Sequence, residues 1–319
     1  MTSTQYPHYL PRQTHLRYFE DPRRPGFIWL YKRGAEPVQV SFDNVAKERN
    51  IWPREVEDAL TSLENATQPL LERLINEPGE ARLTAEEEAI VAEFAALQFA
   101  RVPAQRRVMQ QLTGSVAKLQ AQAQAFLAPE AFEARIEEAR AKGDLPADID
   151  VAEIRRVLQS PDYQVIADQR YGMALSLQMA ESLVPTFLMK RLVVVRSEAE
   201  YFITCDTPVV QIPDPDAPPM YSGGFLMTHV FFPIGRRTGL IWILDDRKEP
   251  AERADQSVII RSKRLGGASA RQIAKNMLAQ AERFVFGSEK NPSLKKLFDS
   301  TEQPRRYSFD SPFDRESEV

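Results

Sequence analysis

The sequence predicts an α+β protein in which strands from the N-terminal and C-terminal parts of the chain form a mostly antiparallel sheet beside a large central helical block. β-Branched and aromatic runs occur within residues 27–40 and 192–244, whereas residues 54–189 repeat their apolar side chains at a helical period. Segregated strands and helices are typical of this class. The economical arrangement is a single sheet that joins both groups of strands, with the helices on one face or side.

The first strands are predicted to form a hairpin, because the run at 27–31 and the run at 38–40 flank a turn that contains Gly34. A second hairpin is expected between the valines at 193–195 and the run at 201–204, since a short polar connection separates them. The segments 228–233 and 239–244 are expected to be two more strands.

The helical block begins with residues 56–74, whose helical period ends at Glu77-Pro78-Gly79. Thr84, with Glu87 three residues later, predicts a capping box at the start of a second helix. Further helices are expected at 108–126, after Pro129 and at 161–189, and a closing helix at 267–286. We predict one domain over residues 1–287 and a polar, loose tail over 288–319.

Composition excludes several functional classes. There are 41 Lys and Arg residues against 45 Asp and Glu, a net charge of −4, which argues against a dedicated surface for duplex DNA. The one cysteine excludes an internal disulfide. Neither a secretory signal nor an apolar tract long enough for a bilayer is apparent. The sequence therefore predicts a soluble, cytoplasmic protein without a membrane partner, and a protein partner would use the Pro- and Gly-rich loop at 213–224 or the tail.

Several short motifs resemble those of a bacterial family classed as a domain of unknown function. The family opens with H-Y-x-P and L-R-x-F, here His8-Tyr9-Leu10-Pro11 and Leu16-Arg17-Tyr18-Phe19, and later carries F-I-T-S-D-x-P-V, here residues 202–209. Arg101-Val102-Pro103 and Phe232-Pro233-Ile234 are also similar. Cys205 replaces the family's serine, the spacing before Leu16 is one residue longer, and Gly235-Arg236 replaces a Ser-Pro pair. The resemblance implies no activity, cofactor or fold.

Asp206 is the main candidate for chemistry, because it follows the run at 201–204 at the point where a strand ends. Its carboxylate could act as a general base or bind a divalent metal ion, which is the one cofactor we consider. The alternative is an Asx-type cap that accepts nearby backbone N–H groups in the turn before Val209. Cys205 has no dedicated base near it in the sequence, and thiol catalysis is disfavoured. No metalloprotease, P-loop, nucleophile-elbow or dinucleotide-binding motif is present.

Four other side chains are candidates. His8 could be a general acid or base, or only fix the N-terminal segment, and His15 and His229 are weaker candidates. Arg101 continues an apolar helical stripe, so it would bind a phosphate or carboxylate ligand or form an internal ion pair. Arg17 has the same alternatives, with a surface ion pair favoured. Asn276 would orient a ligand or bond a neighbouring loop.

Two hypotheses follow. In the first, the protein is a hydrolase of a phosphate-bearing substrate, a nucleotide or nucleic acid, in which Asp206 and His8 are catalytic and Arg17, Arg101 and Asn276 bind substrate. In the second, it is a non-enzymatic ligand-binding or protein-interaction module, and the same side chains are structural. Convergence of the candidates on one solvent-accessible cleft would favour the first hypothesis, whereas an internal pair of Arg101 with Asp206 would favour the second.

Overall fold

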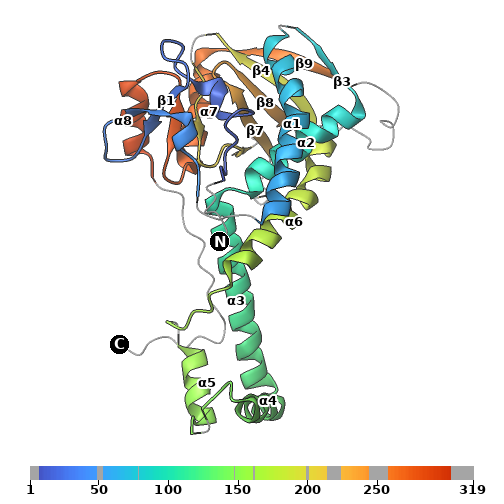
Figure 1. Ribbon diagram of the computed structural model, residues 1–319, viewed down its shortest axis with the longest axis vertical. Coiled ribbons are helices and arrows are strands. Elements are labelled where there is room, and N and C mark those ends of the chain that lie inside the picture. The colour runs from blue at the N-terminus through green and yellow to red at the C-terminus, as the bar shows by residue number, and fades with distance from the viewer. Residues whose placement is uncertain are drawn as a thin grey trace. The chain divides into compact units, whose positions relative to one another are not determined.

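Local sequence signals set the ends of the first helices in the computed structural model (Figure 1). Helix α1 (Arg54–Asn76) begins after Pro53 and continues through Pro69. Helix α2 (Ala85–Ala100) begins at Thr84, whose side chain accepts the N–H of Glu87 while the Glu87 carboxylate accepts the N–H of Thr84. This reciprocal pair confirms the predicted capping box.

The structure describes residues 7–48, 53–77, 79–146, 148–160, 162–198, 201–213, 224–243 and 258–302. Within these ranges the remaining helices are η1 (Leu16–Phe19), η2 (Phe42–Asn44), α3 (Pro103–Leu127), α4 (Pro129–Lys142), α5 (Val151–Gln159), α6 (Gln169–Met189), α7 (Gly267–Gln280) and α8 (Pro292–Ser300). The strands are β1 (Phe27–Tyr31), β2 (Val38–Ser41), β3 (Ala81–Leu83), β4 (Arg191–Ser197), β5 (Thr204–Cys205), β6 (Val210–Pro213), β7 (Thr228–Gly235), β8 (Thr238–Ile243), β9 (Val258–Leu265) and β10 (Val285–Gly287).

The described strands form two sheets, one in the order β2-β1-β10-β5 and one in the order β3-β9-β4-β8-β7-β6. All pairings are antiparallel except that of β4 with β9. The α+β class and the mostly antiparallel pairing are confirmed, as are the β1–β2 hairpin and the adjacent strands β7 and β8.

The prediction of one continuous sheet is wrong, and so is the second hairpin. Val193–Val195 lie between β8 and β9, and the run that ends at Thr204 pairs with β10 instead. The cause is a pair of strands that the sequence pattern does not indicate. β9 carries four consecutive polar or charged residues, Arg261–Arg264, and β10 has only three residues.

The C-terminal part of the chain also differs from the prediction. α7 ends at Gln280 rather than at 286, and Val285–Gly287 form β10. The tail was expected to be loose from 288, but Pro292–Ser300 form α8, whose first turn is capped by the Asn291 side chain on the N–H of Leu294. The rest of the tail, 303–319, and the loop at 214–223 lie outside the described residues.

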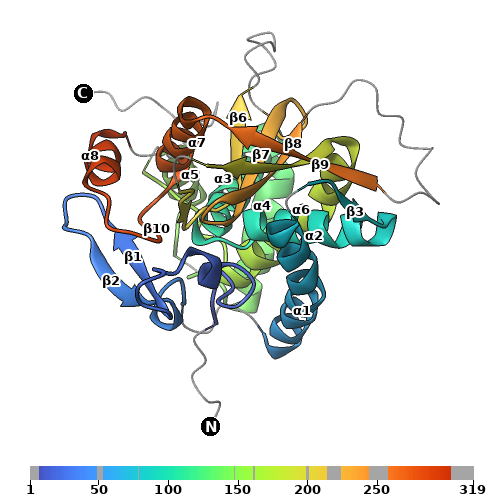
Figure 2. The same ribbon diagram turned by 90° about the horizontal axis from the view of Figure 1, so that it is seen from above.

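The main core lies between one face of the six-stranded sheet and helices α1, α2 and the end of α6 (Figure 2). Alternate residues of the central strands point into it, among them Leu192 and Val194 of β4 and Leu240 and Trp242 of β8. Arg196 fastens α1 to this sheet, since its guanidinium donates to the carbonyls of Leu74 (2.7 Å) and Ile75 (2.8 Å) and to that of Glu77. These are carbonyls that the last turn of a helix leaves without intrahelical partners.

The chain separates by its contacts into two compact units. One contains the described residues up to Gln105 and from Ser176 to 302, and the other contains Arg106–Leu175. The second unit has its own small core around Phe132, Ile136 and Leu158. Because contacts alone do not show whether the units fold independently, the single domain over residues 1–287 stays a prediction. In the described ranges no helix is long and apolar enough to cross a membrane.

Candidate functional site

Asp206 holds the connection between α7 and β10. Its Oδ1 accepts the N–H of Glu282 (2.9 Å), and its Oδ2 accepts the N–H groups of Arg283 (2.7 Å) and Phe284 (3.0 Å). The Asp206 N–H donates to the Phe284 carbonyl (3.0 Å). Only 3% of the residue is exposed. Asp206 therefore caps backbone N–H groups, but its donors lie 76 to 78 residues away and not in the turn before Val209 that the sequence predicts.

Arg33 completes this arrangement from the β1–β2 turn. Its guanidinium donates to the carbonyls of Leu278, Ala281 and Glu282 at 3.2–3.3 Å. It also lies over the ring of Phe298, 4.1 Å from the centroid. Thus Asp206 accepts the N–H groups of the connection while Arg33 donates to its carbonyls. Arg33 is not among the residues that the sequence predicts for the site, because its position in a surface turn gives no sign of this contact.

Burial raises the pKa of Asp206 to about 6, and the three backbone donors oppose that increase. The side chain is therefore ionised at pH 7. Both carboxylate oxygens are nevertheless directed at backbone amides, so a metal ion or a substrate proton would have to displace these bonds. Among the described residues, no group of three or more His, Cys, Asp or Glu side chains could hold a metal ion.

A second group of polar side chains lies inside the first unit, and we call it the buried polar cluster. It consists of the buried residues His15, Gln98, Arg101 and Thr204 and the half-buried residues Glu57 and Glu64. His15 is fully buried, and its Nε2 shares a hydrogen bond with the Thr204 hydroxyl (2.7 Å). Its ring stacks on Phe232 at 5.1 Å between centroids and contacts Phe19 at 5.2 Å. Burial, helped by the charge of Arg101, lowers the pKa of His15 to about 3, so the ring is neutral.

Arg101 is 1% exposed and donates from Nη1 to Glu64 Oε1 at 2.8 Å. Glu64 and Glu57 are seven residues apart on α1 and therefore share a face of that helix. Burial raises the pKa of Glu57, and the charge of Arg101 partly opposes this. Arg101 does form an internal ion pair, as one alternative expected, but its partner is Glu64 and not Asp206.

Gln98 precedes Arg101 by three residues on the same stripe of α2 as Phe94, whose ring contacts Phe232 at 6.0 Å. The Gln98 side chain is fully buried, and within the described ranges neither of its amide atoms has a hydrogen-bond partner. The same holds for His15 Nδ1 and Glu57 Oε2. Native proteins contain few such groups. His15 and Glu57 lie close enough to Arg101 for its charge to affect their pKa values, and Gln98 lies three residues before it on α2.

The other predicted site residues lie elsewhere. His8 is half-buried, and its Nε2 lies 3.3 Å from the Asp43 carbonyl. Burial, followed by the charge of Arg12, lowers the pKa of His8 to about 4. Arg17 lies 3.9 Å from Glu72 in a partly exposed pair. Asn276 accepts from Gln272 at 3.4 Å. In the part of the chain that the structure describes, Asp206, His8, Arg17, Arg101 and Asn276 make no direct contact with one another.

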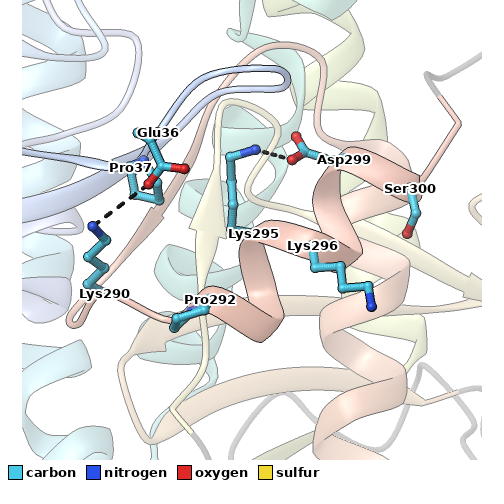
Figure 3. A pocket seen from close by; sticks show the side chains of 8 residues that line it. All are labelled: Glu36, Pro37, Lys290, Pro292, Lys295, Lys296, Asp299 and Ser300. Atoms are coloured by element: carbon cyan, nitrogen blue, oxygen red, sulfur yellow. Dashed lines mark hydrogen bonds and ion pairs between the residues drawn. The ribbon is translucent and has the colours of Figure 1, made fainter.

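A surface cavity of about 650 Å³ lies between the β1–β2 turn and α8 (Figure 3). Figure 3 shows Lys290 directed at Glu36, 3.8 Å away, and Lys295 at Asp299, whereas Lys296 points away from both pairs. The basic and acidic side chains largely balance, and none of the predicted site residues lines the cavity. It is therefore a weaker candidate than the buried polar cluster.

The family model described as "Protein of unknown function (DUF4238)" matches residues 6–291. The chain belongs to this family. The match includes every residue of the buried polar cluster and both Arg33 and Asp206. No curated protein and no solved structure matches the chain. Membership in DUF4238 therefore assigns no activity, and functional inference depends on the geometry of the chain itself.

The segments that carry the family resemblance meet at the buried polar cluster. His15 directly precedes the Leu16–Phe19 motif, and Arg101 begins Arg101-Val102-Pro103. Thr204 belongs to the motif at 202–209, and Phe232 belongs to Phe232-Pro233-Ile234. The contacts of His15 with Phe19, Phe232 and Thr204 bring three of these motifs together directly. His15 is a weak candidate in the sequence, where it is expected to face solvent, but the structure buries it completely.

Proposed function

We propose that this DUF4238 protein binds a small polar molecule at the buried polar cluster, and that Asp206 and His8 serve the fold. The observation that carries this proposal is Gln98, a fully buried amide whose donor and acceptor atoms have no hydrogen-bond partner in the described part of the chain. A buried amide of this kind lowers stability by about 1–3 kcal/mol relative to a satisfied one. An apolar residue would serve a purely structural role better.

The chemistry of the cluster favours an uncharged ligand. Arg101 is already paired with Glu64, and His15 is neutral. Gln98 offers two donors and one acceptor, and Glu57 Oε2 and His15 Nδ1 are further buried polar atoms without a hydrogen-bond partner in the described residues. The rings of Phe19, Phe94 and Phe232 border this group. A flat molecule with donors and acceptors on one edge, such as an amide, a urea or a nucleobase, matches these groups.

The hydrolase of a phosphate-bearing substrate stays a prediction. The three amide donors on Asp206 favour the binding function over it, because a general base must exchange such bonds for a substrate proton. The ion pair of Arg101 with Glu64 likewise reduces its attraction for a phosphate group.

The test is a thermal-shift screen of nucleobases, nucleosides and small amides against the wild-type protein and Gln98→Leu. We expect at least one compound to raise the melting temperature of the wild type, and the raised value to depend on its concentration. Gln98→Leu should melt at the same or a higher temperature without compound and show no shift with it.

Gln272→Leu is the matched control, because Gln272 is exposed on α7 and should leave the compound-induced shift unchanged. The proposal is overturned if no compound shifts the wild type, or if Gln98→Leu responds as the wild type does. A large loss of stability in Gln98→Leu alone would also overturn it, since Gln98 would then be a satisfied structural group.

A further inference from the structure

The face of the six-stranded sheet opposite the main core has a distinct charge pattern. Strand pairing places Val193 beside Arg261 and Val195 beside Lys263, and it places Arg82 beside position 259. Since alternate residues of a strand share a face, Arg191 lies on the same side as Val193. The charged residues Arg82, Arg191, Arg261 and Lys263 are all exposed, and we call them the basic sheet face.

The described strand positions on this side carry no acidic residue. Besides the four basic residues they are Ile241, Ile243 and Gly239 on β8, His229, Phe231 and Pro233 on β7, and uncharged residues of β4, β6 and β9. Within the described ranges, Arg82, Arg261 and Lys263 form no ion pair. The chain as a whole carries a net charge of −4, so this concentration of positive charge is local.

The four cations are close together. Neighbouring strands lie about 4.8 Å apart and alternate residues along a strand about 6.6 Å apart. Arg82, Arg261 and Arg191 stand on three successive strands, β3, β9 and β4, so their backbones span about 10 Å across the sheet. Ile241 and Ile243, both half-buried, adjoin them on β8 and offer an apolar surface beside the charges.

We propose that the basic sheet face binds single-stranded nucleic acid through its phosphates. A second copy of the chain is disfavoured as the occupant, because a two-fold contact would place like charges against each other. The described apolar residues on this side are half-buried or buried, which disfavours insertion into a lipid surface. A flat sheet presents an extended surface rather than an element that enters a duplex groove. The phosphates of a flexible single strand can follow the cations across the three strands.

The experiment measures fluorescence anisotropy of labelled oligo-dT and oligo-U with the full-length protein from 50 to 300 mM salt. The double variant Arg261→Ala/Lys263→Ala removes two cations from the face. The matched control, Lys290→Ala/Lys296→Ala, removes two cations beside the α8 cavity (Figure 3). Because each phosphate contact to a single strand contributes about 0.7 to the salt slope of log affinity, the double variant should reduce that slope by about 1.4.

We expect the double variant to bind at least tenfold more weakly than the wild type at 50 mM salt, and the control to stay within twofold. Melting temperatures establish whether both variants are folded. If the double variant is not folded, Arg82→Ala at the sheet edge replaces it. The proposal is overturned if the wild type shows no saturable binding, or if variant and control weaken equally. Tighter binding of a duplex, of anionic vesicles or of a poly-glutamate peptide would overturn it as well. None of these outcomes bears on the small-molecule site.

Discussion

Removing the Asp206 carboxylate should destabilise the protein through the connection between α7 and β10. Asp206→Ala leaves the N–H groups of Glu282, Arg283 and Phe284 without their acceptor. Asp206→Asn keeps one carbonyl oxygen. That oxygen can take the place of Oδ2, which serves Arg283 and Phe284, but the amide N–H₂ then faces the N–H of Glu282.

The magnitude follows from the number of donors and their surroundings. A buried donor left without an acceptor costs about 1–3 kcal/mol. Asp206 is almost fully buried, but Glu282 and Phe284 are half-buried and Arg283 is exposed, so water can reach part of the connection. We therefore expect a loss of about 3–5 kcal/mol for Asp206→Ala and about 2 kcal/mol for Asp206→Asn, which loses one hydrogen bond and sets its amide N–H₂ against the N–H of Glu282.

Urea titrations monitored by circular dichroism measure these losses in the free energy of unfolding. Arg17→Gln is the control, because its pair with Glu72 is 3.9 Å long and partly exposed, and it should change stability by less than about 0.5 kcal/mol. Amide hydrogen exchange adds a local measure, since protection at 282–284 should fall in Asp206→Ala before that of the main core.

The result that would refute this reasoning is an Asp206→Ala variant within about 1 kcal/mol of the wild type, a loss too small for three orphaned donors. Asp206→Asn also separates the two functional hypotheses. Loss of a turnover at unchanged stability would favour the hydrolase, whereas lower stability without any turnover in either form favours a structural role.

Two further predictions concern other buried contacts. Arg196→Met keeps the aliphatic stem but removes the donors to the carbonyls of Leu74, Ile75 and Glu77. It should therefore lower the free energy of unfolding, measured in urea, by about 2–4 kcal/mol. A change below about 0.5 kcal/mol would contradict the role of Arg196 at the end of α1. His15 has a folded-state pKa of about 3, below that of an unfolded histidine, so the unfolded state binds the extra proton and stability falls as pH drops below about 6.5. Each such histidine contributes a slope of about 1.4 kcal/mol per pH unit between pH 5 and 6, and His8, with a pKa of about 4, behaves in the same way. His15→Asn should therefore lower the slope measured in urea titrations over this range by about 1.4 kcal/mol per pH unit, while Asp206, whose pKa burial raises to about 6, contributes in the opposite direction in both forms. An unchanged slope would show that His15 is not buried as a neutral ring.

Local order was largely predictable from the sequence. The capping box of Thr84 and Glu87 and the period of α1 involve residues within a few positions of one another, so their pattern identifies them directly. The short strands were not predictable in this way. β10 has three residues and β5 has two, too few for a period, and they are stabilised by pairing with each other and with β1.

The candidate site likewise combines residues that the sequence marks with contacts that it does not predict. The motif at 202–209 marked Asp206 as unusual, and a cap was one of its two alternatives, but its donors at 282–284 follow a helix far along the chain. His15 and Gln98 gave a weaker signal still. A glutamine in a helix is ordinary, and only the packing of α2 against the sheet removes its amide from water.

The sequence by itself determined the α+β class, the principal helices, the first hairpin and the resemblance of the segments around Leu16, Arg101 and Asp206 to the family. Those features depend on the period of apolar side chains and on contacts between residues close in sequence, and both can be recognised in the sequence itself. Only the tertiary structure decided that the strands divide into two sheets, that Asp206 caps the α7–β10 connection, and that Arg101 faces Glu64. The physical reason is that strand partners and loss of solvent arise between residues distant in sequence, where no local pattern records which segments meet.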